Sequence, residues 1–235
     1  MNPLIIVLSV IIVIIIFFII RSYFFSTKTL ATNINLKDNP VDISSAEITN
    51  PASVLYSFGT WIYVNNFQNN RIITYRNPTN PISVNNPPRF SLVLGGTEGN
   101  TESSNKPVLT AILNANNQPL KIVITTNFPI QKWVYVVVSV DTVFCDCYLD
   151  GKLTVSKQIP QILTGQEGSI KFGNFTGLNG DILLTKVSRW DYPLDPQSVW
   201  NEYLAGNGLS QAANLSIALN VKTDNNTKEY KIYSN

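Results

Sequence analysis

The amino-acid sequence predicts an all-β protein, a two-sheet sandwich of jelly-roll type with one short helix, preceded by an N-terminal transmembrane helix. Three observations lead to this prediction. Residues 4–20 are almost entirely apolar, and short strand-like segments recur between Asn, Pro and Gly clusters in the remainder. One segment alone carries the capping residues of a helix. The expected organisation is a transmembrane anchor (1–25), a linker (26–52) and a jelly-roll domain (53–235).

The apolar run is predicted to be a single membrane-spanning helix. Its 17 residues form about 25 Å of helix, and Arg21 and Tyr23 can lie at the level of the lipid headgroups. A signal peptide would have a basic start and a shorter apolar part, and a buried core helix would be apolar on one stripe only. The residues assigned to the bilayer are Leu4, Ile5, Ile6, Val7, Leu8, Val10, Ile11, Ile12, Val13, Ile14, Ile15, Ile16, Phe17, Phe18, Ile19 and Ile20.

The charges near the span predict its orientation. Arg21 and two lysines follow the apolar run, so the positive-inside rule places the C-terminal domain in the cytosol. Three glycosylation triplets, at Asn174, Asn214 and Asn225, would be used on the opposite side of the membrane. In a chain this rich in Asn, Ser and Thr, such triplets are expected by chance.

Two long segments have the pattern of strands, and the second has that of a central strand of a sandwich. Residues 54–64 place Val54, Tyr56, Phe58, Ile62 and Val64 on one face, with Thr60 as the exception, and residues 132–141 are apolar on both faces. A last hairpin is expected to turn at residues 224–226. Further short strands are expected at residues 71–76, 89–95, 108–113, 120–126, 170–172 and 181–190.

One tight hairpin and one helix are predicted from their terminal residues. Asp150 and Gly151 provide the positive-φ positions of a two-residue turn between strands 145–149 and 152–157. Asp195 can cap a helix that has Pro196 at its first position and ends at Gly206. The expected buried face of this helix comprises Val199, Trp200, Tyr203 and Leu204.

Composition excludes many classes of function. The 235 residues have 17 Lys+Arg and 15 Asp+Glu, a net charge of +2, and no basic run of the kind that nucleic-acid binding requires. The absence of His excludes His-based triads, His zinc sites and His proton shuttles. Cys145 and Cys147 are too few for a disulfide scaffold or a four-cysteine zinc site, and we expect buried free thiols.

Two stretches resemble known families. Lys-Trp-Val-Tyr-Val-Val-Val-Ser-Val-Asp at 132–141 and Cys-Tyr-Leu-Asp-Gly-Lys at 147–152 resemble the core of concanavalin A-like, laminin-G-like jelly rolls. Gly-Leu-Asn-Gly-Asp-Ile, Val-Ser-Arg-Trp-Asp-Tyr and Leu-Asp-Pro-Gln-Ser-Val-Trp-Asn-Glu-Tyr-Leu-Ala-Gly, between 177 and 206, resemble the closing segment of lectin-like domains in single-span membrane proteins of large nucleocytoplasmic DNA viruses. The viral pattern has a Cys after the Asp-Gly turn, which 155–160 lacks. The landmarks are Trp133, Asp150, Gly151, Trp190, Pro196, Trp200 and Tyr203.

The resemblance, which covers residues 54–208, implies a structural virion protein. Such a minor capsid or inner-membrane protein would tether the membrane to the capsid through its jelly roll, with the domain on the cytosolic, capsid-facing side. Its partners would be the lipid bilayer and capsid or other virion proteins, together with further copies of itself. The alternative is a membrane-anchored adhesin that binds glycans during host attachment.

No catalytic, metal or cofactor site is predicted. Retaining glycoside hydrolases of this fold need closely spaced acids on one strand, a spacing that the six glutamates do not have. Asp141, Asp146 and Asp150 could offer oxygens to a sugar or to Ca²⁺, but Asp141 ends a strand and Asp150 belongs to a turn. A Ca²⁺ site built partly from backbone carbonyls is left open. Residues 95–99 lack the Lys and the helix of a phosphate loop, so a turn is expected there. The chain is therefore expected not to be an enzyme.

Overall fold

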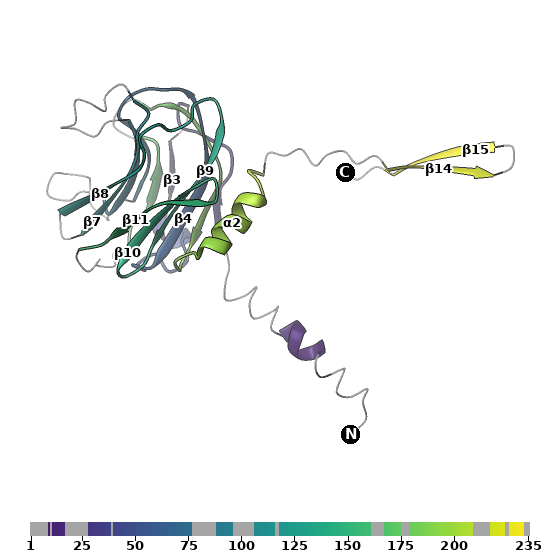
Figure 1. Cartoon of the computed structure of the whole chain (residues 1–235), viewed down its shortest axis with the longest axis horizontal. Helices are drawn as coiled ribbons and strands as arrows, with labels where there is room; N and C mark the ends of the chain where they lie inside the picture. The colour runs from purple at the N-terminus through teal and green to yellow at the C-terminus, as the bar shows by residue number, and fades with distance from the viewer. Residues whose placement is uncertain are drawn as a thin grey trace.

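The computed structural model describes residues 9, 11–16, 28–38, 40–76, 88–95, 106–115, 118–160, 167–174, 179–208, 217–223 and 226–232. Within these residues, two antiparallel sheets enclose the main core, and one short α-helix covers the outer face of the first sheet (Figure 1). The predicted all-β jelly-roll sandwich with one short helix is confirmed.

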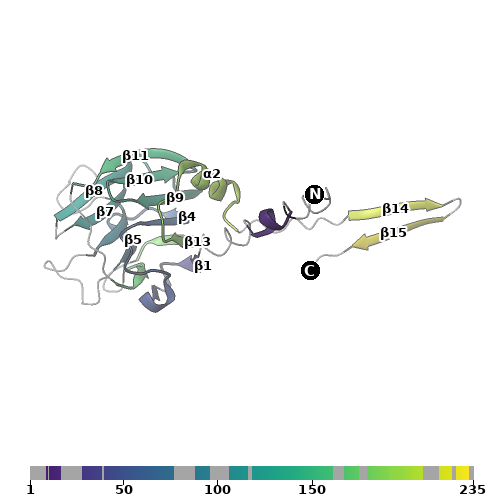
Figure 2. The same ribbon diagram turned by 90° about the horizontal axis from the view of Figure 1, so that it is seen from below.

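The two sheets have seven and six strands. The order in the first sheet is β1 (Lys28–Ala31), β13 (Asp181–Trp190), β4 (Tyr56–Asn66), β9 (Trp133–Val140), β10 (Phe144–Leu149) and β11 (Lys152–Gln158), with β2 (Ile34–Asn35) also paired to β13 (Figure 2). The order in the second sheet is β3 (Val41–Ile43), β12 (Ile170–Phe172), β5 (Arg71–Arg76), β6 (Phe90–Leu94), β7 (Leu109–Ala115) and β8 (Gln118–Thr125).

Strand β9 is buried on both faces, as its sequence predicts. Val134, Val136, Val138 and Val140 belong to the core between the sheets, while the outward-facing residues, such as Val137, belong to a second cluster. In the neighbouring strand β4, the inward face contains Tyr56, Phe58, Ile62 and Val64, whereas Val54 precedes the strand.

The predicted hairpin and helix are both present. Asp150 and Gly151 have φ angles of 46° and 77°, and they connect β10 to β11. Helix α2 (Pro196–Leu204) begins after Asp195, whose carboxylate accepts hydrogen bonds from the backbone N–H groups of Gln197 (2.9 Å) and Ser198 (3.0 Å). This is the expected way to satisfy the free donors of a helix N-terminus.

The prediction that Leu204 belongs to the buried face of this helix is wrong. Val199 is completely buried, and Trp200 and Tyr203 are half-buried, but Leu204 is 63% exposed. Since successive helical residues turn by about 100°, Leu204 lies about 140° around the axis from Val199. The face of α2 that packs on the sheet does not extend this far around the helix, so Leu204 points to solvent.

The prediction of a linker over residues 26–52 is wrong for residues 28–48. This segment contains β1, β2, β3 and the 3₁₀ turn η1 (Ser45–Glu47), and its strands form edges of both sheets. The strands have only two to four residues, too few to show a period, and their partners β13 and β12 lie far away in the sequence. Four of its side chains are buried in the main core, namely Ile34, Leu36, Ile43 and Ile48.

Most of the predicted membrane anchor lies outside the described residues. Ser9 and residues 11–16 are helical, and the apolar side chains of residues 11–16 are exposed. Among the described residues, none of the helices has both the length and the apolar character that a membrane crossing requires. The anchor therefore stays a prediction from the sequence.

The C-terminal residues form the predicted hairpin. Strand β14 (Ile217–Thr223) pairs with β15 (Asn226–Ile232), and Thr223 lies opposite Asn226. The two strands make a separate sheet, and the described residues show no pairing between them and the sandwich. As far as the chain is described, the predicted 53–235 domain thus contains sandwich strands, helix α2 and a hairpin whose strands pair with each other.

Candidate functional site

Helix α2 is held on the first sheet by a cluster of aromatic residues. Trp190 is 1% exposed and packs in the same cluster as Trp61, Tyr135 and Val199. The ring of Tyr203 stacks on Trp61, with centroids 5.6 Å apart and an interplanar angle of 21°. The landmark residues at the end of the domain therefore act in packing, which places the start of α2 at a defined point on the sheet.

Two buried serines fasten the segment that leads into this helix. The backbone N–H of Leu194 donates to the hydroxyl oxygens of Ser57 (2.8 Å) and Ser139 (3.0 Å). Ser57 in turn donates to the carbonyl of Tyr192 at 3.0 Å. Because buried polar groups are costly without partners, these bonds determine where residues 193–196 cross the outer face of β9.

A hollow of about 250 Å³ lies between this segment and the outer face of strands β9 and β10. The floor comes from β9 and β10, and the wall comes from the residues before α2. Its volume is slightly below the range of about 300–1,000 Å³ that is typical of small-ligand sites. The lining residues are Ser139, Asp141, Phe144, Asp146, Tyr148, Pro193, Leu194, Asp195 and Pro196.

Two of the three carboxylates in the hollow stabilise the local backbone. Asp141 accepts from the N–H groups of Val143 (2.5 Å) and Phe144 (2.8 Å). Asp195 caps α2 and also accepts from the Ser198 hydroxyl at 2.6 Å, and these bonds hold the pKa of Asp195 below its usual value. Asp195 therefore carries negative charge at neutral pH.

Asp146 is the third carboxylate in the hollow, and the described residues show no backbone N–H that donates to it. Its Oδ1 atom is buried and has no hydrogen-bond partner among the described residues. An unpartnered buried oxygen is costly, and functional sites are one place where that cost is retained. Burial, followed by the charges of Asp146 and Asp195, raises the pKa of Tyr148 to about 12, so its hydroxyl remains a neutral donor.

This arrangement suits a neutral ligand rich in hydroxyl groups. The carboxylates are acceptors for hydroxyl donors, and Phe144, which is 44% exposed, offers an apolar ring beside them. No Lys or Arg is among the lining residues, so an anionic ligand would meet charges of its own sign.

The structure separates the three aspartates that the sequence offers as ligand groups. Asp141 and Asp146 lie together in the hollow, but Asp150 does not: its Oδ1 accepts from the N–H of Tyr135 at 3.0 Å, and Oδ2 lies 3.6 Å from the Lys132 ammonium group. Sequence reasoning assigns Asp195 only to the helix cap. The sequence-based prediction misses the other residues of the wall, because no pattern in the neighbouring sequence indicates that residues 193–196 cross β9.

The other candidates named from the sequence are buried in the fold, belong to a turn, or lie outside the described residues. Cys145 and Cys147 are free and buried, as predicted. The hydrogen bond with Cys147, together with burial, raises the pKa of the Cys145 thiol far above its ordinary value, so it stays protonated. Gly95 has a φ of 95°, whereas residues 96–99 are outside the described part. Within the described residues, no group of three His, Cys, Asp or Glu side chains is placed to hold a metal ion.

Comparisons with known proteins identify the fold. No protein-family model matches the chain, and no curated protein matches it either. Among solved structures, it is similar to the botulinum neurotoxin serotype D ligand-binding domain in complex with N-acetylneuraminic acid, with a TM-score of 0.56, 13% identity, and coverage of 83% of this chain and 48% of that one. The likeness is one of fold.

Two further toxin domains show the same relation. The receptor-binding domain of the botulinum neurotoxin C/D mosaic serotype has a TM-score of 0.54 and 15% identity over 83% of this chain and 46% of that one. The serotype D binding domain has a TM-score of 0.54 and 15% identity, covering 82% and 46%. The chain thus spans about half the length of these structures, and it shares with them a jelly-roll sandwich that is consistent with a concanavalin-like fold.

Proposed function

We propose that this chain is a non-catalytic, membrane-anchored protein that binds neutral glycans in the hollow beside α2. The observation that carries the proposal is the combination of Asp146, whose buried Oδ1 is unpartnered among the described residues, with the exposed ring of Phe144 in one hollow of about 250 Å³. A similar fold in the botulinum serotype D domain was solved with a bound sugar, N-acetylneuraminic acid, which supports a sugar as the class of ligand.

The charge of the hollow favours a neutral sugar over an acidic one. Asp141, Asp146 and Asp195 give a local negative field, and no basic residue among those lining the hollow offsets it. Neutral hydroxyl groups can donate to these carboxylates, whereas the carboxylate of a sialic acid would be repelled. The ligand class proposed here therefore differs from that named for the serotype D domain.

Replacing Asp146 by Asn is expected to weaken the binding of neutral oligosaccharides by about tenfold or more. A hydrogen bond to a charged acceptor contributes roughly 1.5–3 kcal/mol, and tenfold in affinity corresponds to about 1.4 kcal/mol. The measurement is titration calorimetry on the full chain in detergent, with ligands chosen from a glycan array. The Phe144→Ala variant should also bind more weakly, because it removes the apolar ring.

The matched control is Asp42→Asn, which removes a carboxylate from the second sheet, where Asp42 pairs with Lys171 at 3.3 Å. This variant should bind as the native chain does. A preference of the native chain for sialylated ligands, or equal losses in the Asp42 and Asp146 variants, would contradict the proposal.

A structural role in a virion is the second candidate. It is favoured by the resemblance of residues 177–206 to the closing segment of viral lectin-like domains and by the basic residues after the predicted span. In this function the domain is cytosolic and docks to capsid proteins or to other copies of the chain. The glycan-binding function instead places the domain on the lumenal or external side.

Membrane topology separates the two candidates. We expect the full chain to sediment with membranes and to resist alkaline extraction, and a variant that lacks residues 4–20 to stay in the supernatant. Protease protection in sealed vesicles and sensitivity to glycosidase then report the side of the domain. A protected, glycosylated domain would contradict the virion tether, and an accessible, unglycosylated domain would count against the adhesin.

A further inference from the structure

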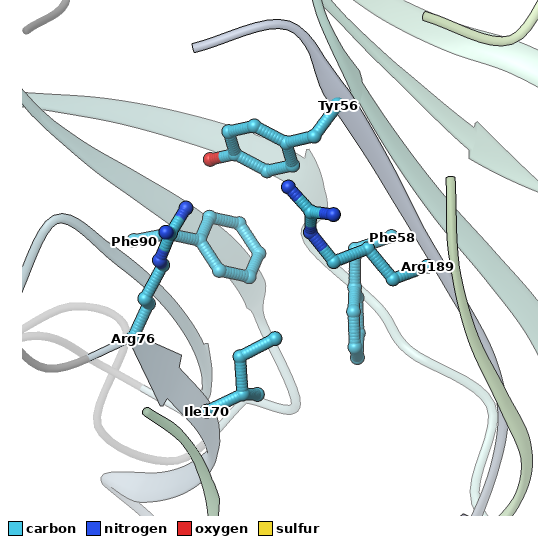
Figure 3. A pocket seen from close by; sticks show the side chains of 6 residues that line it. All are labelled: Tyr56, Phe58, Arg76, Phe90, Ile170 and Arg189. Carbon is cyan, nitrogen blue, oxygen red and sulfur yellow. The ribbon is translucent and has the colours of Figure 1, made fainter. Parts of the chain in front are cut away.

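A second cavity lies between the two sheets and differs from the hollow in its chemistry. Its walls combine three aromatic rings with two arginines (Figure 3). The residues that line it are Tyr56, Phe58, Arg76, Phe90, Ile170 and Arg189. Figure 3 shows the guanidinium groups of Arg76 and Arg189 on either side of the Phe90 ring, with Tyr56 next to both.

Both arginines are almost completely buried. Arg76 is 8% exposed and Arg189 is 5% exposed, although arginine is among the residues least often buried. Arg76 is buried because its position on β5 faces the core. It pairs with the buried residue Phe90 of β6. A charged group taken out of water needs compensation from hydrogen bonds and from opposite charge.

Arg189 donates hydrogen bonds to the backbone, and the attraction of the nearby Asp191 influences its pKa less than burial and the charge of Arg76 do. Its Nη1 donates to the carbonyl of Thr49 at 2.7 Å, its Nη2 donates to the carbonyl of Asn50 at 3.3 Å, and its Cζ lies 5.8 Å from the centre of the Tyr56 ring. A guanidinium has five N–H donors, so these two bonds leave donors for the cavity. No carboxylate is among the residues that line the cavity.

The electrostatics of the cavity are those of a site for negative charge. Burial, and then the neighbouring charge of Arg76, lower the pKa of Arg189 to about 10, and burial also lowers the pKa of Arg76. Burial raises the pKa of Tyr56, so its hydroxyl stays protonated. An anion would be attracted by both cations, and the tyrosine hydroxyl could donate to it.

The size of the cavity limits what it can hold. Its volume is about 10 Å³, which is close to the room that a single water molecule requires. We propose that the cavity is a structural site for one monovalent anion of halide size, held by Arg76 and Arg189 between the sheets. The anion would hold the end of β13 to the end of β5 by neutralising two like charges that face each other across the core.

The test compares thermal unfolding of the full chain in sodium chloride with that in sodium gluconate at equal ionic strength, since gluconate is too large for the cavity. Chloride should raise the unfolding midpoint in a saturable way, by roughly 3–6 °C at ten times the dissociation constant. Crystals soaked in bromide should show an anomalous peak between Arg76 and Arg189. A midpoint that is the same in both salts, together with no bromide peak, would overturn the proposal.

Variants make the test specific to the cavity. Arg76→Met should remove the chloride dependence, and Arg189→Met should do the same if the domain still folds. The matched control is Arg71→Met at the other end of β5, which is outside the cavity lining and should keep the chloride response. A chloride response that persists in Arg76→Met, or a bromide peak at another position only, would also contradict the site.

Discussion

Replacing Trp190 by alanine is expected to lower the free energy of unfolding by about 3–5 kcal/mol, one of the two largest effects that we expect for this chain. Trp190 ends β13, is 1% exposed, and fills the space between the first sheet and α2. Gly59 on β4 allows this close packing, since a Cβ there would lie 2.9 Å from Cζ3 of Trp190. Urea denaturation followed by circular dichroism measures the effect without depending on the lost indole fluorescence.

The control for this prediction is Leu204→Ala on the same helix. Leu204 is 63% exposed, so its removal should change the free energy of unfolding by less than about 0.5 kcal/mol. Similar losses in the two variants would mean that packing of the indole beneath α2 does not stabilise the domain in the way described.

Replacing Gly151 by alanine is expected to cost about 2–4 kcal/mol. Two effects combine at this position. Its φ of 77° is unfavourable for a residue with a side chain by roughly 1 kcal/mol, and the new Cβ would lie 2.7 Å from Cε3 of Trp200 and 3.2 Å from Cβ of Tyr203. Overpacking of this kind typically adds about 1–3 kcal/mol, because α2 would have to move away from the hairpin.

Gly206→Ala separates these two effects. Gly206 has a φ of 75°, almost the same as that of Gly151, but a Cβ added to Gly206 would meet no atom within 4 Å among the described residues. Its replacement should therefore show only the backbone effect, about 1 kcal/mol, in the same denaturation experiment. If Gly206→Ala is as destabilising as Gly151→Ala, close contact between the β10–β11 turn and α2 is not what makes glycine necessary at 151.

The elements with strong local signals could be predicted. Strand β9 alternates apolar residues on both faces, Asp150 and Gly151 form the turn of a hairpin, and Asp195 followed by Pro196 starts α2. In each case the deciding interaction joins residues close together in the chain, or depends on a simple period, so it is visible in the sequence.

The candidate site could be predicted only in part. The sequence indicates Asp141 and Asp146 as possible ligand groups, but it does not associate Asp195 and Phe144 with them. The hollow exists because Ser57 and Ser139, 82 positions apart, hold Leu194 across the face of β9. No pattern in any one of these segments indicates that they meet.

By itself, the sequence determined the class of fold, most of its long strands, the hairpin, the helix and the apolar run at residues 4–20, because local periodicity and terminal residues specify these. Only the tertiary structure decided that β1, β2 and β3 lie at the edges of the sheets, that Leu204 is exposed, and that Arg76 and Arg189 face one cavity. These features depend on strand pairing and contacts between segments that are distant in the sequence. Such contacts form, and stabilise the protein, only when the two sheets have packed together around a common core.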